Sequence, residues 1–195
     1  MSSSRSNNAR GIALIEVLVS LVILLFGLLG LVGISSRANL SELEAYQRVH
    51  ALQLLQDMAD RLNANRKVAA CYSNGATGVT LGNGSTTVPD CTAGTVQERT
   101  RAAADLAAWD AMLKGAAETQ GDSKLGGMIG AVGCVTQESA ADSIYLIAVA
   151  WQGLAETAAP LLADDKTKFP CGADAYGKEK LHRVATTKVR IGALK

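Results

Sequence analysis

The sequence is poor in aromatic residues and histidines and has no large surplus of either charge. Aromatic residues make up 4% of its 195 residues, two histidines are present, and the formal net charge is +1. A charge this close to zero excludes the basic footprint of a nucleic-acid-binding protein and an acidic tail. The length predicts one globular domain together with an additional helix.

Catalytic and metal-binding motifs are also missing. The sequence has no P-loop, no G-x-S-x-G motif, no H-E-x-x-H motif and no Cys-x-x-Cys pair. His50 and His182 lie far apart, and loop carboxylates such as Asp164 and Asp165 do not have the spacing of a metal-binding loop. We therefore expect no enzymatic activity, no catalytic residues, no metal site, no cofactor and no small-molecule substrate.

Cysteine is missing from the first 70 residues, and the four cysteines that follow are Cys71, Cys91, Cys134 and Cys171. An even number in a domain outside the cytoplasm is typical of two disulfides, whereas four buried thiols would be expected in a cytosolic domain. Four cysteines allow three pairings. We favour Cys71–Cys91 and Cys134–Cys171, because each closes a local loop flanked by turn-forming residues.

Residues 12–34 form a long apolar segment without proline. As a helix its 23 residues would extend about 35 Å, which is enough to cross a bilayer core about 30 Å thick. Residues 1–11 carry Arg5 and Arg10 and no acid, and the next charge after the segment is Arg37, so the positive-inside rule favours a cytoplasmic N-terminus over the reverse orientation. A secretory signal peptide is the competing interpretation, but its apolar region is usually only about 7–15 residues long.

Glu16 is the one charged residue inside this apolar segment. A carboxylate at the centre of a bilayer costs on the order of 2.5–3.5 kcal/mol, and less near the interface. Such a residue is either tolerated near the lipid headgroups or paired with a cation on another chain. Glu16 taken alone favours neither alternative.

The surrounding residues favour pairing. Arg10 and Gly11, followed by IALIEVLVSL at 12–21, resemble the class III signal of type IV prepilins and type II secretion pseudopilins. The resemblance implies that a prepilin peptidase cuts after Gly11 and N-methylates Ile12, where phenylalanine is commoner in the family. It also implies that the new amino group of Ile12 meets Glu16 of a neighbouring subunit. This pairing would set the register between subunits and relieve the cost of an unpaired charge in apolar surroundings.

The pattern beyond residue 34 predicts that the same helix continues. Apolar residues from Leu40 to Leu62 recur mostly every three or four positions with polar residues between them, so one helix should run from about 12 to 64. The predicted divisions are a prepilin leader (1–11), a transmembrane and polymerisation half of the helix (12–35), an amphipathic half (36–66) and a periplasmic globular head (67–195).

The head is predicted to begin with a disulfide-closed loop and a second helix. Residues 71–94 are rich in glycine, serine, threonine and asparagine, with a short hairpin predicted through Val79–Leu81 and Thr86–Val88. Thr95 and Glu98 form a capping box that opens a helix to about Lys114. The expected apolar stripe of this helix comprises Ala102, Leu106, Trp109 and Leu113.

Three further strands are predicted at 128–136, 143–152 and 183–191. The strand at 143–152 is apolar on both faces and should therefore be central, with Tyr145 and Trp151 in the core. Residues 153–181 should form a loop. The predicted fold class is α+β, the pilin fold, in which a long N-terminal helix packs on a small antiparallel sheet and is accompanied by an extra helix and disulfide-closed loops.

The C-terminal half resembles one subgroup of type IV pilus minor pilins, PilV, the type IV pilus modification protein. The segments that carry this resemblance are Asp105–Trp109, the strand around Cys134, Val149–Gly153, Phe169–Gly172 and the closing strand at 183–191. The resemblance implies a structural subunit that primes pilus assembly with other minor pilins and the major pilin, and that joins the tip complex. It would lie in the inner membrane with a periplasmic head before assembly, and in the pilus at the cell surface afterwards.

Two alternatives share part of this pattern. A minor pseudopilin of a type II secretion system carries the same anchor signal, but the large head, the two expected disulfides and the C-terminal segments favour the pilus. Copurification with pilus or secretion subunits distinguishes the two. A membrane-anchored adhesin or ligand-binding head would keep its leader and would function without the peptidase.

Overall fold

The computed structural model describes residues 9–83, 90–115, 119–120, 123–124, 128–164 and 166–192. The chain divides into two compact units, residues 1–43 and residues 44–195. Helix α1 (Ala9–Ala64) contributes to both units and confirms the helix predicted at 12–64. It is the one helix among the described residues that is long and apolar enough to cross a membrane. The predicted domain boundaries remain predictions.

In the second unit, one face of α1 is buried against the rest of the head. This face comprises Ala51, Leu54, Leu55, Met58, Ala59 and Leu62. The predicted apolar stripe from Leu40 to Leu62 is therefore correct only in its last part, because Val49 and Leu52 are exposed. A step of three residues turns only about 300° around a helix with 3.6 residues per turn, so a row repeating every third residue drifts off one face.

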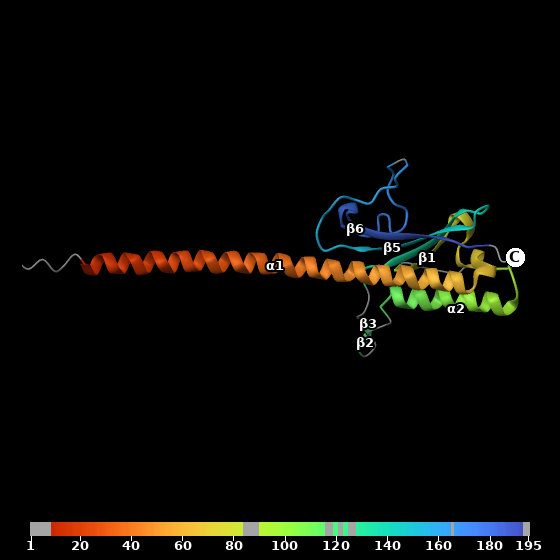
Figure 1. Cartoon of the computed structure of the whole chain (residues 1–195), viewed down its shortest axis with the longest axis horizontal. Coiled ribbons are helices and arrows are strands. Elements are labelled where there is room, and N and C mark those ends of the chain that lie inside the picture. Colours follow the sequence, from red (N-terminus) through yellow and green to blue (C-terminus); the bar gives the residue numbers. More distant parts are fainter. Residues whose placement is uncertain are drawn as a thin grey trace, which may run out of the picture. The chain divides into compact units, whose positions relative to one another are not determined.

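The head contains one antiparallel sheet of four strands in the order β1-β4-β5-β6 (Figure 1). The strands are β1 (Val79–Gly82), β4 (Val132–Ser139), β5 (Ile144–Gln152) and β6 (His182–Arg190). The predicted fold class is confirmed. Strand β5 lies inside the sheet, as its two apolar faces predict. Tyr145 and Trp151 face the main core beneath α1, whereas Ala148 and Ala150 face a second apolar cluster.

Two strand predictions need correction. Strand β4 begins at Val132 instead of residue 128, because Gly130 has a positive φ of 62° and the N–H of Ala131 closes a turn onto the Met128 carbonyl at 3.3 Å. Residues Val79–Leu81 do form a strand, but it pairs with β4 and places Thr80 opposite Cys134. The other half of that predicted hairpin, Thr86–Val88, lies outside the described residues.

Helix α2 (Val96–Leu113) begins at the predicted capping box, and its predicted stripe is buried. Trp109 is fully buried, and its Nε1–H donates to the carbonyl oxygen of Leu54 at 3.0 Å, so α2 is fastened to α1. The remaining elements are the 3₁₀ helices η1 (Arg66–Tyr72), η2 (Gly75–Thr77) and η3 (Glu179–Leu181), and a small ribbon of β2 (Thr119–Gln120) and β3 (Ser123–Lys124).

The loop between β5 and β6 covers part of the second face of the sheet. Phe169 and Tyr176 are buried there against Ala148 and Ala150. His182 is fully buried, with Nε2 at 2.9 Å from the Cys171 carbonyl oxygen and Nδ1 at 3.2 Å from Glu179 Oε2. The histidine therefore has a packing role and fixes the end of the loop to the start of β6.

Candidate functional site: an exposed apolar helix and a disulfide-closed head

The residues predicted to direct processing and assembly lie at the start of α1. Gly11 and Ile12 belong to the first turns of this helix. The side chain of Glu16 is exposed. Ser20 Oγ donates to the main-chain carbonyl oxygen of Glu16 at 2.7 Å, one helical turn away. The Glu16 carboxylate makes no ion pair with any residue that the structure describes.

The first unit exposes an uninterrupted apolar surface around Glu16. The large side chains from Leu14 to Ile34 are all at least 40% exposed, and Leu14 and Phe26 reach 70%. Soluble proteins rarely expose an apolar surface of this extent, because its transfer out of water is strongly favourable. The segment is therefore suited to surroundings of lipid or of other apolar helices.

A network around Asp105 fixes the end of α1 to α2. Arg61 Nη1 donates to Asp105 Oδ1 at 2.9 Å, and the hydroxyl of Tyr72 donates to Asp105 Oδ2 at 2.5 Å. Asn65 Nδ2 donates to the Tyr72 hydroxyl at 3.3 Å. Burial raises the pKa of Tyr72, and the hydrogen bond to Asp105 raises it further. Sequence reasoning missed this network, because its members are 33 and 44 residues apart and follow no short-range pattern.

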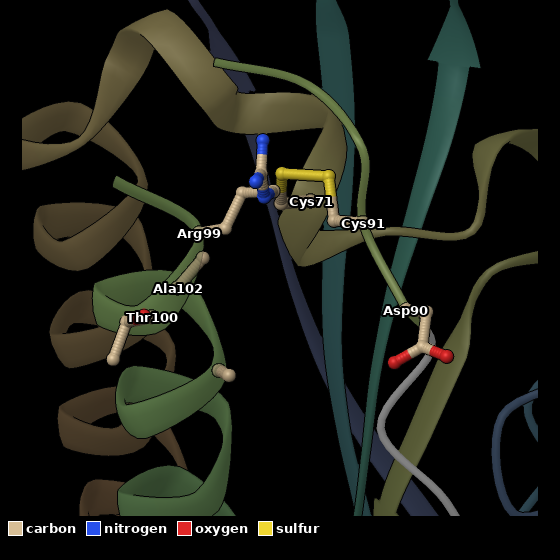
Figure 2. Close-up of a pocket in the computed structure, with 7 residues that line it drawn as sticks. Cys71, Asp90, Cys91, Arg99, Thr100 and Ala102 are labelled. Atoms are coloured by element: carbon tan, nitrogen blue, oxygen red, sulfur yellow. A yellow bond between two sulfur atoms is a disulfide. The ribbon is translucent and has the colours of Figure 1, made fainter. Parts of the chain in front are cut away.

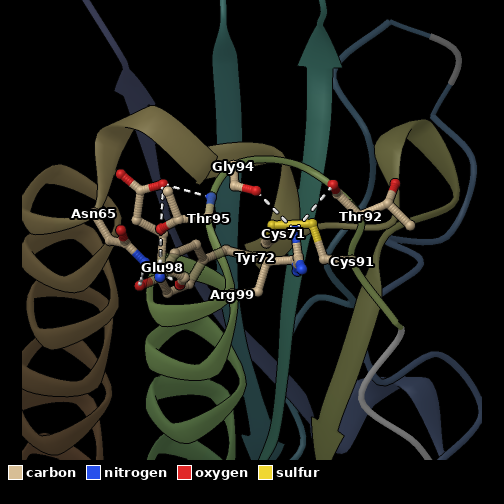
Figure 3. The surroundings of a disulfide bond; sticks show 9 residues. All are labelled: Asn65, Cys71, Tyr72, Cys91, Thr92, Gly94, Thr95, Glu98 and Arg99. Carbon is tan, nitrogen blue, oxygen red and sulfur yellow. Dashed lines mark hydrogen bonds between the residues drawn. A yellow bond between two sulfur atoms is a disulfide. The ribbon is translucent and has the colours of Figure 1, made fainter.

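The disulfide between Cys71 and Cys91 closes the loop that precedes α2 (Figure 3). Next to it, Arg99 Nη1 donates to the carbonyl oxygens of Thr92 and Gly94 at 3.3 and 2.7 Å. The loop is therefore held from both sides, by the disulfide and by the first turn of the helix that follows it. Cys134–Cys171 is the second disulfide and joins β4 to the loop before β6. Both are the predicted pairings.

A cavity of about 300 Å³ lies beside the first disulfide (Figure 2). Its lining comprises Cys71, Asp90, Cys91, Arg99, Thr100, Ala102 and Ala103. The guanidinium of Arg99 is already engaged by two backbone carbonyls. Among the described residues, no group of three or more histidine, cysteine, aspartate or glutamate side chains could hold a metal ion. Arg99, in the lining of this cavity, therefore holds the loop in place. The seven lining residues place no nucleophile beside a base.

A clamp on Glu44 joins α1 to the end of the sheet. Its Oε1 accepts from the backbone N–H groups of Leu154 and Ala155 at 3.0 and 3.1 Å, and from Arg183 Nη2 at 3.2 Å. A Cβ on Gly153 would lie 2.6 Å from Arg183 Cζ, so glycine makes room for the guanidinium. The sequence gives no indication of this clamp, since Glu44 resembles any other exposed acid on an amphipathic helix.

The capping box at the start of α2 predicts a pH-dependent contribution to stability. The Thr95 backbone N–H and then its hydroxyl hydrogen-bond to the Glu98 carboxylate and lower the pKa of Glu98. A pKa that is lower in the folded state adds stability above the unfolded value, about 4.3 for glutamate, and this stability is lost as pH falls through the folded value. Glu98→Gln should therefore lower the melting temperature at pH 7 and have little effect near pH 3.

The control for this prediction is Glu42→Gln, which removes an exposed carboxylate from α1. Thermal unfolding of the two variants and the wild type at pH 3, 5 and 7 provides the measurement. If Glu98→Gln lowered the melting temperature by the same amount at all three pH values, the charge of the Glu98 carboxylate would not contribute to stability.

Two protein-family models match the chain. The model described as "Prokaryotic N-terminal methylation motif" matches residues 6–32, which include Gly11, Ile12 and Glu16. The model described as "Type IV pilin Tt1218" matches residues 34–112, from the end of the apolar segment through most of α2. Strands β4, β5 and β6 lie beyond both matches. Neither the search of curated proteins nor the search of solved structures gave a significant match.

Proposed function

We propose that this chain is a type IV pilin, and specifically a minor pilin of the PilV kind. The match to the type IV pilin model over residues 34–112 and the match to the methylation motif over residues 6–32 support a pilin subunit. In this role it primes pilus assembly together with other minor pilins and the major pilin, and it joins the complex at the pilus tip. The observation that carries the proposal is the exposed apolar half of α1, which starts beside Gly11 and contains one carboxylate, Glu16.

Processing creates the positive charge with which Glu16 pairs. A cut after Gly11 removes Arg5 and Arg10 with the leader and leaves an amino group on Ile12, which the same peptidase methylates. The cation on Ile12 then lies at the end of an apolar helix, and a neighbouring subunit offers Glu16. Each charge is costly in apolar surroundings when alone, so their pairing favours one register between neighbouring helices.

The apolar half of α1 also determines the proposed location of the protein in the cell. Before assembly, the apolar half of α1 spans the inner membrane and the head lies in the periplasm, where both disulfides form. After assembly the same helix surface is covered by the helices of neighbouring subunits in the pilus. Close packing of that kind is compatible with Gly27, Gly30 and Gly33, where an added Cβ would meet nothing within 4 Å in the isolated chain.

The assignment to the PilV kind rests on the C-terminal segments. Trp151, at the end of β5, is buried in the main core, and Gly153 accommodates the guanidinium of Arg183. Phe169 and Cys171 are buried against the opposite face of the sheet, with Cys171 bonded to Cys134. Segments that resemble PilV thus hold both faces of the head, which supports a shared head architecture.

Mass spectrometry of the mature N-terminus tests the processing step. We expect the chain isolated from sheared pili to begin with N-methylated Ile12, and the chain from cells without prepilin peptidase to keep residues 1–11. Gly11→Val should give the unprocessed form in otherwise normal cells, because the bulky side chain replaces the glycine at the cut. An intact leader on functional protein would instead favour an anchored receptor, and copurification with secretion subunits would favour a pseudopilin.

A further inference from the structure

Strand β6 forms one outer edge of the sheet over nine residues (Figure 1). It pairs with β5 residue by residue, from Ile144 opposite Arg190 to Gln152 opposite His182, without a shift in register. Among the described strands, none pairs with its other side. Its exposed residues are Thr186, Lys188 and Arg190. The edge is therefore long, regular and accessible.

Backbone hydrogen bonds at the two ends of this ladder show which groups are unpaired. The backbone N–H of Ile191 donates to the carbonyl oxygen of Ser143 at 3.0 Å, and the backbone N–H of Gly153 donates to the carbonyl oxygen of Leu181 at 2.7 Å. Both bonds join directly opposed, odd-numbered residues. Hydrogen-bonded and non-hydrogen-bonded pairs alternate in an antiparallel ladder, so the odd-numbered residues of β6 face β5. The backbone groups of Val184, Thr186, Lys188 and Arg190 consequently point outward.

An edge of this kind is normally protected by a proline, a bulge, a covering segment, a very short strand or charged side chains, especially lysine. Strand β6 contains no proline and no bulge. It carries two cations, and these form ion pairs at the surface. Lys188 Nζ lies 2.7 Å from Glu138 Oε2, and Arg190 Nη2 lies 3.3 Å from Asp142 Oδ1. With Lys188 and Arg190 64% and 72% exposed, such pairs contribute little and are easily exchanged for other carboxylates.

We propose that the outer edge of β6 receives an extended strand from the head of a different pilin, with carboxylates opposite Lys188 and Arg190. Backbone groups along the edge would bind the strand, and the two cations would fix its direction. The half-buried Val184 suits an apolar residue at the other end. A second copy of this chain fits poorly, because two β6 strands would bring four cations onto one short ladder. The inference depends on the proposed function only for the neighbour being a pilin.

Proline substitutions can distinguish loss of binding at the outer edge of β6 from loss of folding. Thr186→Pro removes an outward N–H and takes no bond from the β5–β6 ladder, so the head should keep both disulfides and its melting temperature. Thr186→Ala is the matched control, because it shortens the side chain but keeps the outward N–H. Thr187→Pro removes a backbone hydrogen bond to β5 and is therefore the positive control for a disrupted sheet, with a lower melting temperature.

Photo-crosslinking of the full chain in pilus-producing cells tests the docked strand. A benzophenone amino acid is placed in turn at the positions of Val184, Thr186 and Lys188, and crosslinked peptides are sequenced. We expect crosslinks to one segment of another pilin head, advancing by two residues between successive positions. Crosslinks from position 184 should persist with Thr186→Ala and be lost with Thr186→Pro.

Crosslinks that are absent, that join two copies of this chain or that do not advance in register would overturn the proposal. So would a Thr186→Pro head that melts like the wild type and still crosslinks. Incorporation of the unmodified chain into sheared pili, measured in the same cells, reports separately on the proposed function. A chain that is absent from pili but shows a register of crosslinks would refute the function and leave strand docking in place.

Discussion

Trp109→Ala should lower the free energy of unfolding of the head by about 3–5 kcal/mol, the usual cost of truncating a buried tryptophan. The ring projects from α2 and is fully buried, in contact with α1 at Leu54 and with β4 at Gly133. A Cβ on Gly133 of β4 would lie 2.4 Å from the Trp109 ring and 2.6 Å from Leu113, so the indole packs directly on the strand backbone. Gly133 itself has no side chain that could fill the space that alanine would leave.

Urea unfolding of the full chain in detergent, followed by near-ultraviolet circular dichroism, gives this free energy. Trp109→Phe keeps most of the ring and removes the donor to the Leu54 carbonyl, which should cost about 1–2 kcal/mol. Val96→Ala is the matched control on the same helix, because Val96 is 68% exposed and should change stability by less than about 0.5 kcal/mol. A loss below about 1 kcal/mol for Trp109→Ala would contradict the packing described.

The burial of Trp109 could be predicted from the sequence, whereas its partners could not. Ala102, Leu106, Trp109 and Leu113 follow the helical repeat, and this repeat alone indicates a buried stripe. Gly133 gives no comparable indication, because a glycine inside a strand is equally compatible with a bulge or a bend. The same limit applies to β1: local turn residues predict a hairpin there, whereas its pairing with β4 joins residues 50 to 56 positions apart.

The predictable part of the candidate site is the part that depends on local sequence. Gly11, Ile12 and Glu16 belong to one short pattern, and the disulfides close loops bounded by turn residues. The hydrogen bonds to Asp105 and to Glu44 join residues 33 to 139 positions apart, so neither the network nor the clamp has a local pattern. Which face of α1 is buried is also decided by the head, since Leu43, Val49 and Leu52 follow a similar spacing yet remain exposed.

Glu16→Ala should leave the chain in the membrane but strongly reduce its incorporation into pili. The substitution makes the apolar segment more apolar, so insertion should be at least as favourable as in the wild type. Incorporation should fall because the amino group of a neighbouring Ile12 would lose its partner in apolar surroundings. Every 1.4 kcal/mol lost from that contact lowers the equilibrium constant for subunit association about tenfold. Immunoblots of membranes and of sheared pili from the same cells give the two quantities.

Three further variants separate charge from other effects of the substitution. Glu16→Gln keeps the shape and polarity of the side chain, so it should behave like Glu16→Ala if the ion pair matters. Glu16→Asp keeps the charge and should restore part of the incorporation. Ser20→Ala removes the other polar side chain of this helix turn, whose hydroxyl reaches only the main-chain oxygen of Glu16, and should assemble normally. If Glu16→Gln were incorporated like the wild type, pairing with the amino group of Ile12 could not be what sets the register.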